Sequence, residues 1–215
     1  MTDFSTARRH MVDSQVRPSD VTDQRVISAM LDVARERFVP PAATALAYLD
    51  QDLAVSAARR LLKPMVLAKL LNAADLAESD RVLVVGCAMG YSAAVLAGIV
   101  GQVVALEEDA SLVKAAQAAL AGLPNVSVVS GPLTAGWTQG GPYDVILLDG
   151  ATEVEPQGFC SQLKDGGRLL CVLGTAPNAK AMLYRRSGSE LGGRAIFDAA
   201  AALLPGFAKK REFAF

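Results

Sequence analysis

Short apolar runs alternate with amphipathic segments between residues 81 and 173. Apolar runs of this kind, rich in Val, Ile and Leu, are typical of buried strands in a parallel sheet, and the segments between them predict helices such as Ala110–Leu120. Each crossover is expected to be right-handed. The predicted strands are Arg81–Val85, Gln102–Glu107, Val126–Ser130, 145–149 and 167–173.

The segments on either side of this core have other patterns. Residues 1–75 read mostly as helix: one helix starts near Asp23, stops before Pro40, and another covers residues 65–72 after Lys63-Pro64, while residues 45–55 read as irregular. At the other end, the pattern predicts two antiparallel edge strands, and residues 199–204 fit a helical turn equally well. These strands are 179–186 and 194–202, joined by the turn-rich residues 187–193.

Together these elements predict an α/β fold. We expect a Rossmann-like, doubly wound, seven-stranded and mostly parallel sheet, with helices on both faces and a helical N-terminal extension. The whole chain, 1–215, is expected to form one domain. Its parts are the extension at 1–75, a ligand-binding core at 76–175 and the edge strands at 176–215.

Residues 81–107 carry the pattern of a nucleoside-binding unit. A strand leads through the glycine turn 86–90 into a helix, and the next strand ends on Glu107. Such a turn lets the backbone and a helix N-terminus approach a ligand closely, and the carboxylate can accept hydrogen bonds from both ribose hydroxyls. The spacing is G-x-x-x-G rather than the G-x-G-x-x-G of dinucleotide binders. The alternative is a parallel-sheet protein whose glycines only form ordinary turns.

Composition narrows the functional classes. The net charge of −1 gives no general attraction to nucleic acid or to an anionic membrane, and the apolar stretch 93–106 is too interrupted to span a bilayer. The N-terminus lacks the apolar region of a signal peptide, and the three cysteines form no C-x-x-C pair, so we expect reduced thiols in the cytoplasm. With one histidine and no cluster at ligand spacing, no metal site is predicted.

Several segments, in order, resemble the protein-L-isoaspartate O-methyltransferase family. They are MVDSQVRPSDVTDQRVISAMLDVARERFVP, AYLD, VLVVGCAMGYSAAVLAGIV, NVSVVSG, YDVILLDGA and LKDGGRLLCVLG, and they cover roughly residues 8–175. The resemblance implies an enzyme of protein repair that moves a methyl group from S-adenosylmethionine to a carboxylate of isomerised aspartate, leaving S-adenosylhomocysteine. The nucleophile is already ionised near neutral pH, so positioning and exclusion of water can supply most of the acceleration.

The resemblance and the βαβ pattern together select the cofactor-binding residues. For Asp149 the alternative is a helix N-cap. The expected set is Gly86, Cys87, Ala88, Met89, Gly90, Tyr91, Glu107, Glu108, Pro132, Leu133, Asp149 and Gly150. The expected partner is a protein or peptide substrate, with no nucleic acid or membrane, and the chain is expected to be a monomer or a weak homodimer.

The chain departs from the family at its substrate loop. Where the family reads G-Q-T-I-S-Q-P, this chain has ARRLLKP, so the two hydroxyl positions are Arg60 and Leu62 and no catalytic residue is assigned. The cations of this loop could still attract a carboxylate through charge. The predicted substrate-loop residues are Arg59, Arg60, Leu61, Leu62 and Lys63.

Two acids of the family's cofactor pocket are also replaced, by Val84 and Pro132. One explanation is a methyltransferase with altered activity, and the other is a catalytically silent relative that serves as a binding or regulatory module. A dehydrogenase is a weaker third possibility, because the middle glycine of its motif is missing. A collapsed turn at 86–90 with Glu107 in a buried ion pair would contradict a cofactor role. The aromatic end, residues 207–215, is expected to cap the core in preference to making a dimer contact.

Overall fold

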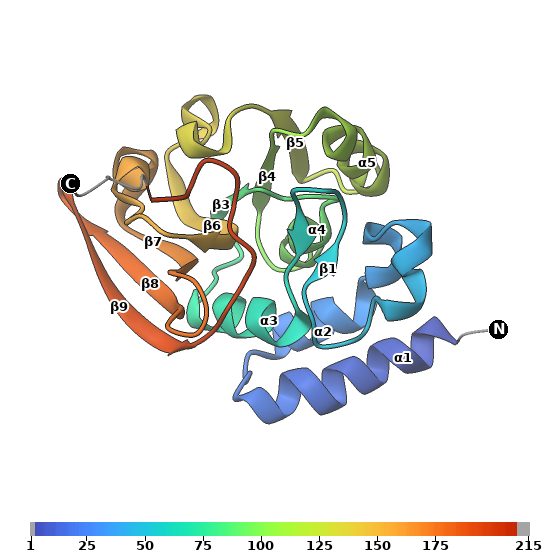
Figure 1. The fold of residues 1–215 in the computed structure, drawn as a ribbon. Helices are drawn as coiled ribbons and strands as arrows, with labels where there is room; N and C mark the ends of the chain where they lie inside the picture. Colours follow the sequence, from blue (N-terminus) through green and yellow to red (C-terminus); the bar gives the residue numbers. More distant parts are fainter. Residues whose placement is uncertain (1–2, 210–215) are drawn as a thin grey trace, which may run out of the picture.

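The computed structural model describes residues 3–209 and contains the predicted seven-stranded sheet, in the order β5-β4-β3-β6-β7-β8-β9 (Figure 1). Neighbouring strands from β5 to β7 pair in parallel, whereas β8 pairs antiparallel with both β7 and β9. The fold class is confirmed, and three predicted strands have the observed bounds. The strands are β3 Arg81–Val85, β4 Gln102–Glu107, β5 Val126–Ser130, β6 Tyr143–Thr152, β7 Leu163–Leu173, β8 Lys180–Ser187 and β9 Glu190–Asp198.

The strand order reverses between β3 and β6. From β3 the chain moves outward through β4 to β5, then returns to the other side of β3 with β6. In open α/β sheets, ligands bind outside the carboxyl ends of the strands at such a switch point. The ends of β3, β4 and β6 therefore define the place to look for a site.

Alternate residues of each central strand face opposite sides of the sheet. Val82 and Val84 pack into one apolar cluster with the α-helices, while Leu83 and Val85 pack into the other. The first face is covered by α2 Gln24–Asp32, α3 Pro64–Ala73, α4 Tyr91–Ala97 and α5 Ala110–Leu120.

The second face differs from the prediction, because its crossovers contain only short 3-10 helices. These are Leu133–Ala135, Thr138–Gly140 and Gln157–Gln162. Gly136 has a φ of 63°, and Gly141-Pro142 and Pro156 interrupt the same stretches, so no long helix can form there.

The N-terminal extension is helical as predicted, but the helix that starts near Asp23 ends at Asp32, earlier than the predicted stop before Pro40. After α1 Phe4–Met11, the chain continues through a π-turn at Val12–Val16 and a 3-10 turn at Arg17–Ser19. Asp23 caps α2 by accepting a hydrogen bond from the Arg25 amide at 2.8 Å. Further 3-10 helices follow at Arg35–Phe38 and Pro41–Leu46.

A two-stranded hairpin follows within and after the stretch predicted to be irregular. It pairs β1 Leu53–Ala54 with β2 Arg60–Leu61, and α3 begins directly after it with Pro64 in its first turn. The hairpin contains two of the predicted substrate-loop residues, Arg60 and Leu61, and it brings that loop to the switch point of the large sheet.

The C-terminal hairpin is confirmed, but its turn is shorter than predicted, because Glu190 already begins β9. The helical turn considered for residues 199–204 is wrong. Residues 199–207, the tail segment, run beside the end of β6, with a parallel bridge between Ala151 and Leu203, and turn at residues 205–206 (Figure 1). Phe207 caps the core by stacking on Phe159, whereas residues 210–215 lie outside the described residues. Between residues 3 and 209 no helix combines the length and the apolar character that a membrane crossing requires.

Candidate cofactor cleft

The turn at 86–90 lies at the carboxyl end of β3 and leads into α4. Its conformation needs small residues: φ is 77° at Gly86, 50° at Ala88 and 99° at Gly90. The amides of Gly86 and Cys87 both donate to the Leu106 carbonyl, at 2.8 and 3.0 Å. The turn is thereby fixed across the end of β4, next to Glu107.

Glu107 lies at the end of β4, as predicted, and is fully buried. Its Oε2 accepts hydrogen bonds from the Ala88 amide at 2.8 Å and from Arg59 Nε at 3.2 Å. Its Oε1 accepts from the amides of Glu108 at 2.9 Å and Asp109 at 3.3 Å. A carboxylate has about four acceptor positions, so these contacts use all of them. The pair with Arg59 is the buried ion pair that we expected to count against a cofactor role, while the turn keeps its positive φ values.

Arg59 therefore points inward, to the end of β4 and the glycine turn, and does not line the surface groove beside its hairpin. Its side chain is only 3% exposed, and Nη2 donates to the Gly86 carbonyl. Successive residues of an extended segment point to opposite sides, and Arg60, the next residue, is exposed. The loop thus divides its cations between the interior and the surface.

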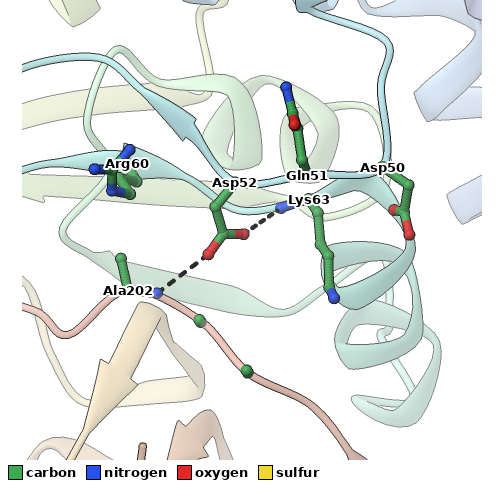
Figure 2. Close-up of a pocket in the computed structure, with 8 residues that line it drawn as sticks. Asp50, Gln51, Asp52, Arg60, Lys63 and Ala202 are labelled. Atoms are coloured by element: carbon green, nitrogen blue, oxygen red, sulfur yellow. Dashed lines mark hydrogen bonds between the residues drawn. The ribbon is translucent and has the colours of Figure 1, made fainter. Parts of the chain in front are cut away.

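Arg60 and Lys63 line a surface groove of about 520 Å³ outside the hairpin. Figure 2 shows Asp52 at its centre, where it accepts hydrogen bonds from the Lys63 amide at 3.0 Å and the Ala202 amide at 3.2 Å. Burial raises the pKa of Asp52, although these two amides counteract the shift. Asp50 accepts from the Met65 amide in the first turn of α3. The remaining wall consists of Gln51 and residues 200–202.

The other two loop residues lie in the core. Leu61 is 1% exposed and Leu62 is 2% exposed, and the Leu62 carbonyl accepts a hydrogen bond from Arg35 Nη2 at 2.6 Å. The position at which the family has a serine hydroxyl is therefore a packing position in this chain.

Asp149 lies inside β6, so it caps no helix and that alternative is wrong. Its Oδ2 accepts from the Ser92 hydroxyl at 2.5 Å, while Oδ1 is buried with no partner in the described chain. Burial raises the pKa of Asp149 to about 6, despite the hydrogen bond from Ser92 and the nearby charges of Arg59 and Arg35. The end of β6 thus contains a buried acid whose pKa lies well above its ordinary value.

The remaining predicted residues surround the turn to different degrees. Cys87 is buried, and burial holds the pKa of its thiol well above its ordinary value, so it is not a nucleophile. Met89 is half-buried, and the Tyr91 ring packs against Arg35, whose guanidinium carbon lies 4.6 Å from the ring centroid. Glu108 is exposed, and its Oε2 lies 3.4 Å from the Leu133 amide.

Pro132 and Gly150 complete the predicted set. Pro132 is exposed beside the buried Leu133. Gly150 is buried beneath the tail segment: a Cβ atom placed on it would lie 2.8 Å from Leu204 Cδ2.

Sequence reasoning missed three side chains of this region: Arg35, Ser92 and Leu204. Arg35 is fully buried and donates to the Ala47 carbonyl at 2.7 Å, and Leu204 is 1% exposed. Arg35 and Ser92 lie in segments that resemble the family, but the residue pattern gave neither a role, and Leu204 lies beyond the part that the resemblance covers. Over residues 3–209, no group of three or more His, Cys, Asp or Glu side chains is placed to hold a metal ion.

The parallel sheet, the turn after β3 and the acid at the end of β4 define a class I methyltransferase fold, a Rossmann-like frame for an adenosine-containing ligand. The family profile for protein-L-isoaspartate(D-aspartate) O-methyltransferase matches residues 6–197. The chain belongs to this family. The predicted family, and with it the enzyme class, is confirmed.

Curated relatives support the same assignment. A protein-L-isoaspartate O-methyltransferase from Pelotomaculum thermopropionicum is 37% identical over 182 residues, covering 84% of this chain and 80% of the relative. One from Methylorubrum extorquens is 38% identical over 189 residues, covering 87% and 83%.

Solved structures show the fold. One protein-L-isoaspartate O-methyltransferase superposes with a TM-score of 0.80 at 25% identity, covering 93% of this chain and 66% of its own length. A Plasmodium falciparum protein described as a beta-aspartate methyltransferase, in complex with S-adenosyl-L-homocysteine, has a TM-score of 0.74 at 15% identity, with coverages of 95% and 99%.

Proposed function

We propose that this chain transfers a methyl group from S-adenosylmethionine to a carboxylate of an isomerised aspartate in a protein substrate. The observation that carries the proposal is the family match over residues 6–197, together with a βαβ unit that places Gly86 and Glu107 side by side. The complex of the Plasmodium falciparum relative with S-adenosyl-L-homocysteine supports the choice of cofactor.

The backbone conformation at the glycine turn suits an adenosine ligand, but nearby side chains occupy part of the space and of the hydrogen-bonding positions that the ligand would need. The turn at 86–90 keeps positive φ values, and the buried Oδ1 of Asp149 lacks a partner, as in a site built for a polar ligand. However, Arg59 uses an acceptor position of Glu107 that a ribose hydroxyl would need. Binding therefore requires Arg59 to move.

In this proposal the residues of the cleft have separate roles. S-adenosylmethionine supplies a methyl group on a sulfonium, which is electrophilic and needs no metal or general base. Glu107 would accept from the ribose hydroxyls, the backbone of the turn would pack against the ligand, and Pro132 and Leu133 would lie beside the base. Asp149, in β6 on the other side of β3, would face the charged part of the ligand.

The acceptor is proposed to enter from the groove of Figure 2. Arg60 and Lys63 line this groove, and neither forms a salt bridge within residues 3–209. The two cations would contact the substrate carboxylate directly, replacing the hydroxyl that the family supplies from the position of Leu62, while Asp50 and Asp52 of the same groove accept hydrogen bonds from backbone amides. Because the carboxylate is already ionised, its orientation and the exclusion of water would contribute most of the acceleration.

The second candidate is a binding module without turnover. It is favoured by the buried pair of Arg59 and Glu107, which satisfies the ribose-binding acid without a ligand. Such a protein would keep the fold and present its surface to a partner.

One pair of assays separates the two functions. Purified protein is incubated with S-adenosylmethionine labelled in the methyl group, together with an isoaspartyl peptide or the matched aspartyl peptide. We expect label only with the isoaspartyl peptide, and micromolar S-adenosylhomocysteine binding by calorimetry. No label with either peptide and no binding at millimolar ligand would refute the enzyme and leave the binding module.

The proposal also covers the compartment, the domain organisation and the oligomeric state of the protein. We place the protein in the cytoplasm as a single methyltransferase domain that acts as a monomer or weak homodimer. The free and buried state of Cys87, Cys160 and Cys171 suits a reducing compartment.

A further inference from the structure

The space beside the glycine turn is filled by the chain itself. A Cβ atom placed on Gly86 would lie 2.6 Å from Arg59 Nη2 and 2.8 Å from Leu204 Cδ2. One placed on Gly150 would lie 2.8 Å from Leu204 Cγ as well as from Cδ2. Glycines at the switch point leave room for a ligand to approach the backbone, and here two side chains from distant segments use that room.

Leu204 is held in place by the backbone of the tail segment. The Ala151 amide donates to the Ala202 carbonyl at 2.8 Å, and the Leu204 amide donates to the Ala151 carbonyl at 2.9 Å. Further along, the Glu153 amide donates to the Phe207 carbonyl at 2.9 Å. The tail segment thus extends the sheet as a short parallel strand across the carboxyl end of β6.

The tail segment is also tied to the hairpin that carries Arg59. Asp52 accepts hydrogen bonds from both the Ala202 amide and the Lys63 amide, as Figure 2 shows. Arg59 enters the cleft from this hairpin, and Leu204 enters it from the tail segment. The two occupants therefore meet beside Gly86 and are supported by one network.

We propose that Arg59 and Leu204 are intrachain competitors of the adenosine cofactor. The ligand-free chain keeps its cleft closed, and the cofactor binds after Arg59 leaves Glu107 and Leu204 leaves Gly86 and Gly150. The inference rests on the proposed function, because it assumes that adenosine is the ligand of this cleft. When only a fraction of the molecules is open, the apparent dissociation constant rises by the inverse of that fraction.

The first test is calorimetry with S-adenosylhomocysteine on the full chain and two variants. Leu204→Ala opens the space while keeping the pair of Arg59 and Glu107, and Arg59→Ala frees Glu107. We expect each to bind about tenfold or more tightly than the unmodified chain. The matched controls are Leu191→Ala, a buried leucine of β9, and Arg185→Ala, an exposed arginine of β8, and both should bind like the unmodified chain.

The second readout does not depend on catalysis. Hydrogen exchange of the Leu204 amide, which is bonded to Ala151 in the closed state, should become faster in saturating ligand. A ligand that bound beside an undisturbed tail would slow this exchange or leave it unchanged.

The outcomes separate this inference from the proposed function. Weaker binding by both variants would make Arg59 and Leu204 cofactor contacts and overturn the competition, while the enzyme would stand. Faster exchange of the Leu204 amide and tighter binding by Leu204→Ala would support it, even if Arg59→Ala failed to fold. Absence of binding by the unmodified chain and by every folded variant would refute both the competition and the proposed function.

Discussion

Replacing Asp149 by asparagine should stabilise the protein, and more so at high pH. Burial raises the pKa of this carboxyl from an ordinary value of 3.8 to about 6. Between these two values the folded state binds more protons than the unfolded state, so the free energy of unfolding falls as the pH rises. The loss is nearly complete above the folded pKa and amounts to about 3 kcal/mol for a rise of about two units.

The measurable quantity is the difference in the free energy of unfolding between Asp149→Asn and the unmodified chain, followed as a function of pH. The linkage relation with these two pKa values gives a penalty of about 2 kcal/mol at pH 5 and about 3 kcal/mol at pH 8. The advantage of Asp149→Asn over the unmodified chain should therefore grow by about 1 kcal/mol over this range, most of it below pH 7. The cost of burying the amide group is the same at both pH values and cancels from the comparison.

Guanidinium chloride unfolding at pH 5, 6, 7 and 8 would measure the effect. Asp20→Asn, at an exposed left-handed position that asparagine tolerates, is the matched control and should show no such trend. An equal difference at every pH would show that burial does not raise the pKa of Asp149 in the folded chain. The nearby charges of Arg59 and Arg35 would then offset burial and keep the carboxylate ionised over this whole range.

Three further substitutions test the packing around the site by chemical denaturation. Asn72→Ala should cost about 1–2 kcal/mol, because the Asn72 side chain accepts two backbone amides before α2 at 2.9 Å each, and Asn72→Asp should restore most of the loss. Asp80→Asn should cost about 2–4 kcal/mol, because Asp80 pairs with Arg168 at a mostly buried site, and high salt should not abolish the difference. Phe207→Ala should cost about 2–4 kcal/mol by removing the stack on Phe159, and it should expose the tail segment to proteases, whereas an unchanged cleavage pattern would contradict this role.

The central strands could be predicted because β3 and β4 are buried on both faces, and such strands form continuous apolar runs. The edge strand β5 is only partly buried, but its valines still mark the observed bounds. The crossovers after β5 and β6 were harder to predict. Glycine and proline interrupt the helical pattern there, and the chain forms short 3-10 helices instead. Local spacing shows that such a stretch is interrupted, but tertiary packing decides what replaces the helix.

The tail segment could not be predicted for a different reason. Residues 199–204 are mostly alanine and leucine, a composition that favours helix. In the structure their backbone groups pair with the end of β6, and a long-range pairing of this kind has no local signature. Leu204, which fills the space beside Gly86 and Gly150, therefore lies in the part of the chain that the family resemblance covers least.

The division between Arg59 and Arg60 shows why a loop motif alone cannot give a residue its role. Both arginines stand in the predicted substrate loop, and composition does not distinguish them. The pairing of the hairpin distinguishes them. Because Ala54 pairs with Arg60, the Arg60 side chain lies at the surface and the neighbouring Arg59 side chain reaches Glu107. A shift of this register by one residue would exchange the two side chains. The same short loop thus supplies one cation to Glu107 and another to the surface groove proposed to admit the acceptor, and substitution of each arginine separately is the way to tell their effects apart.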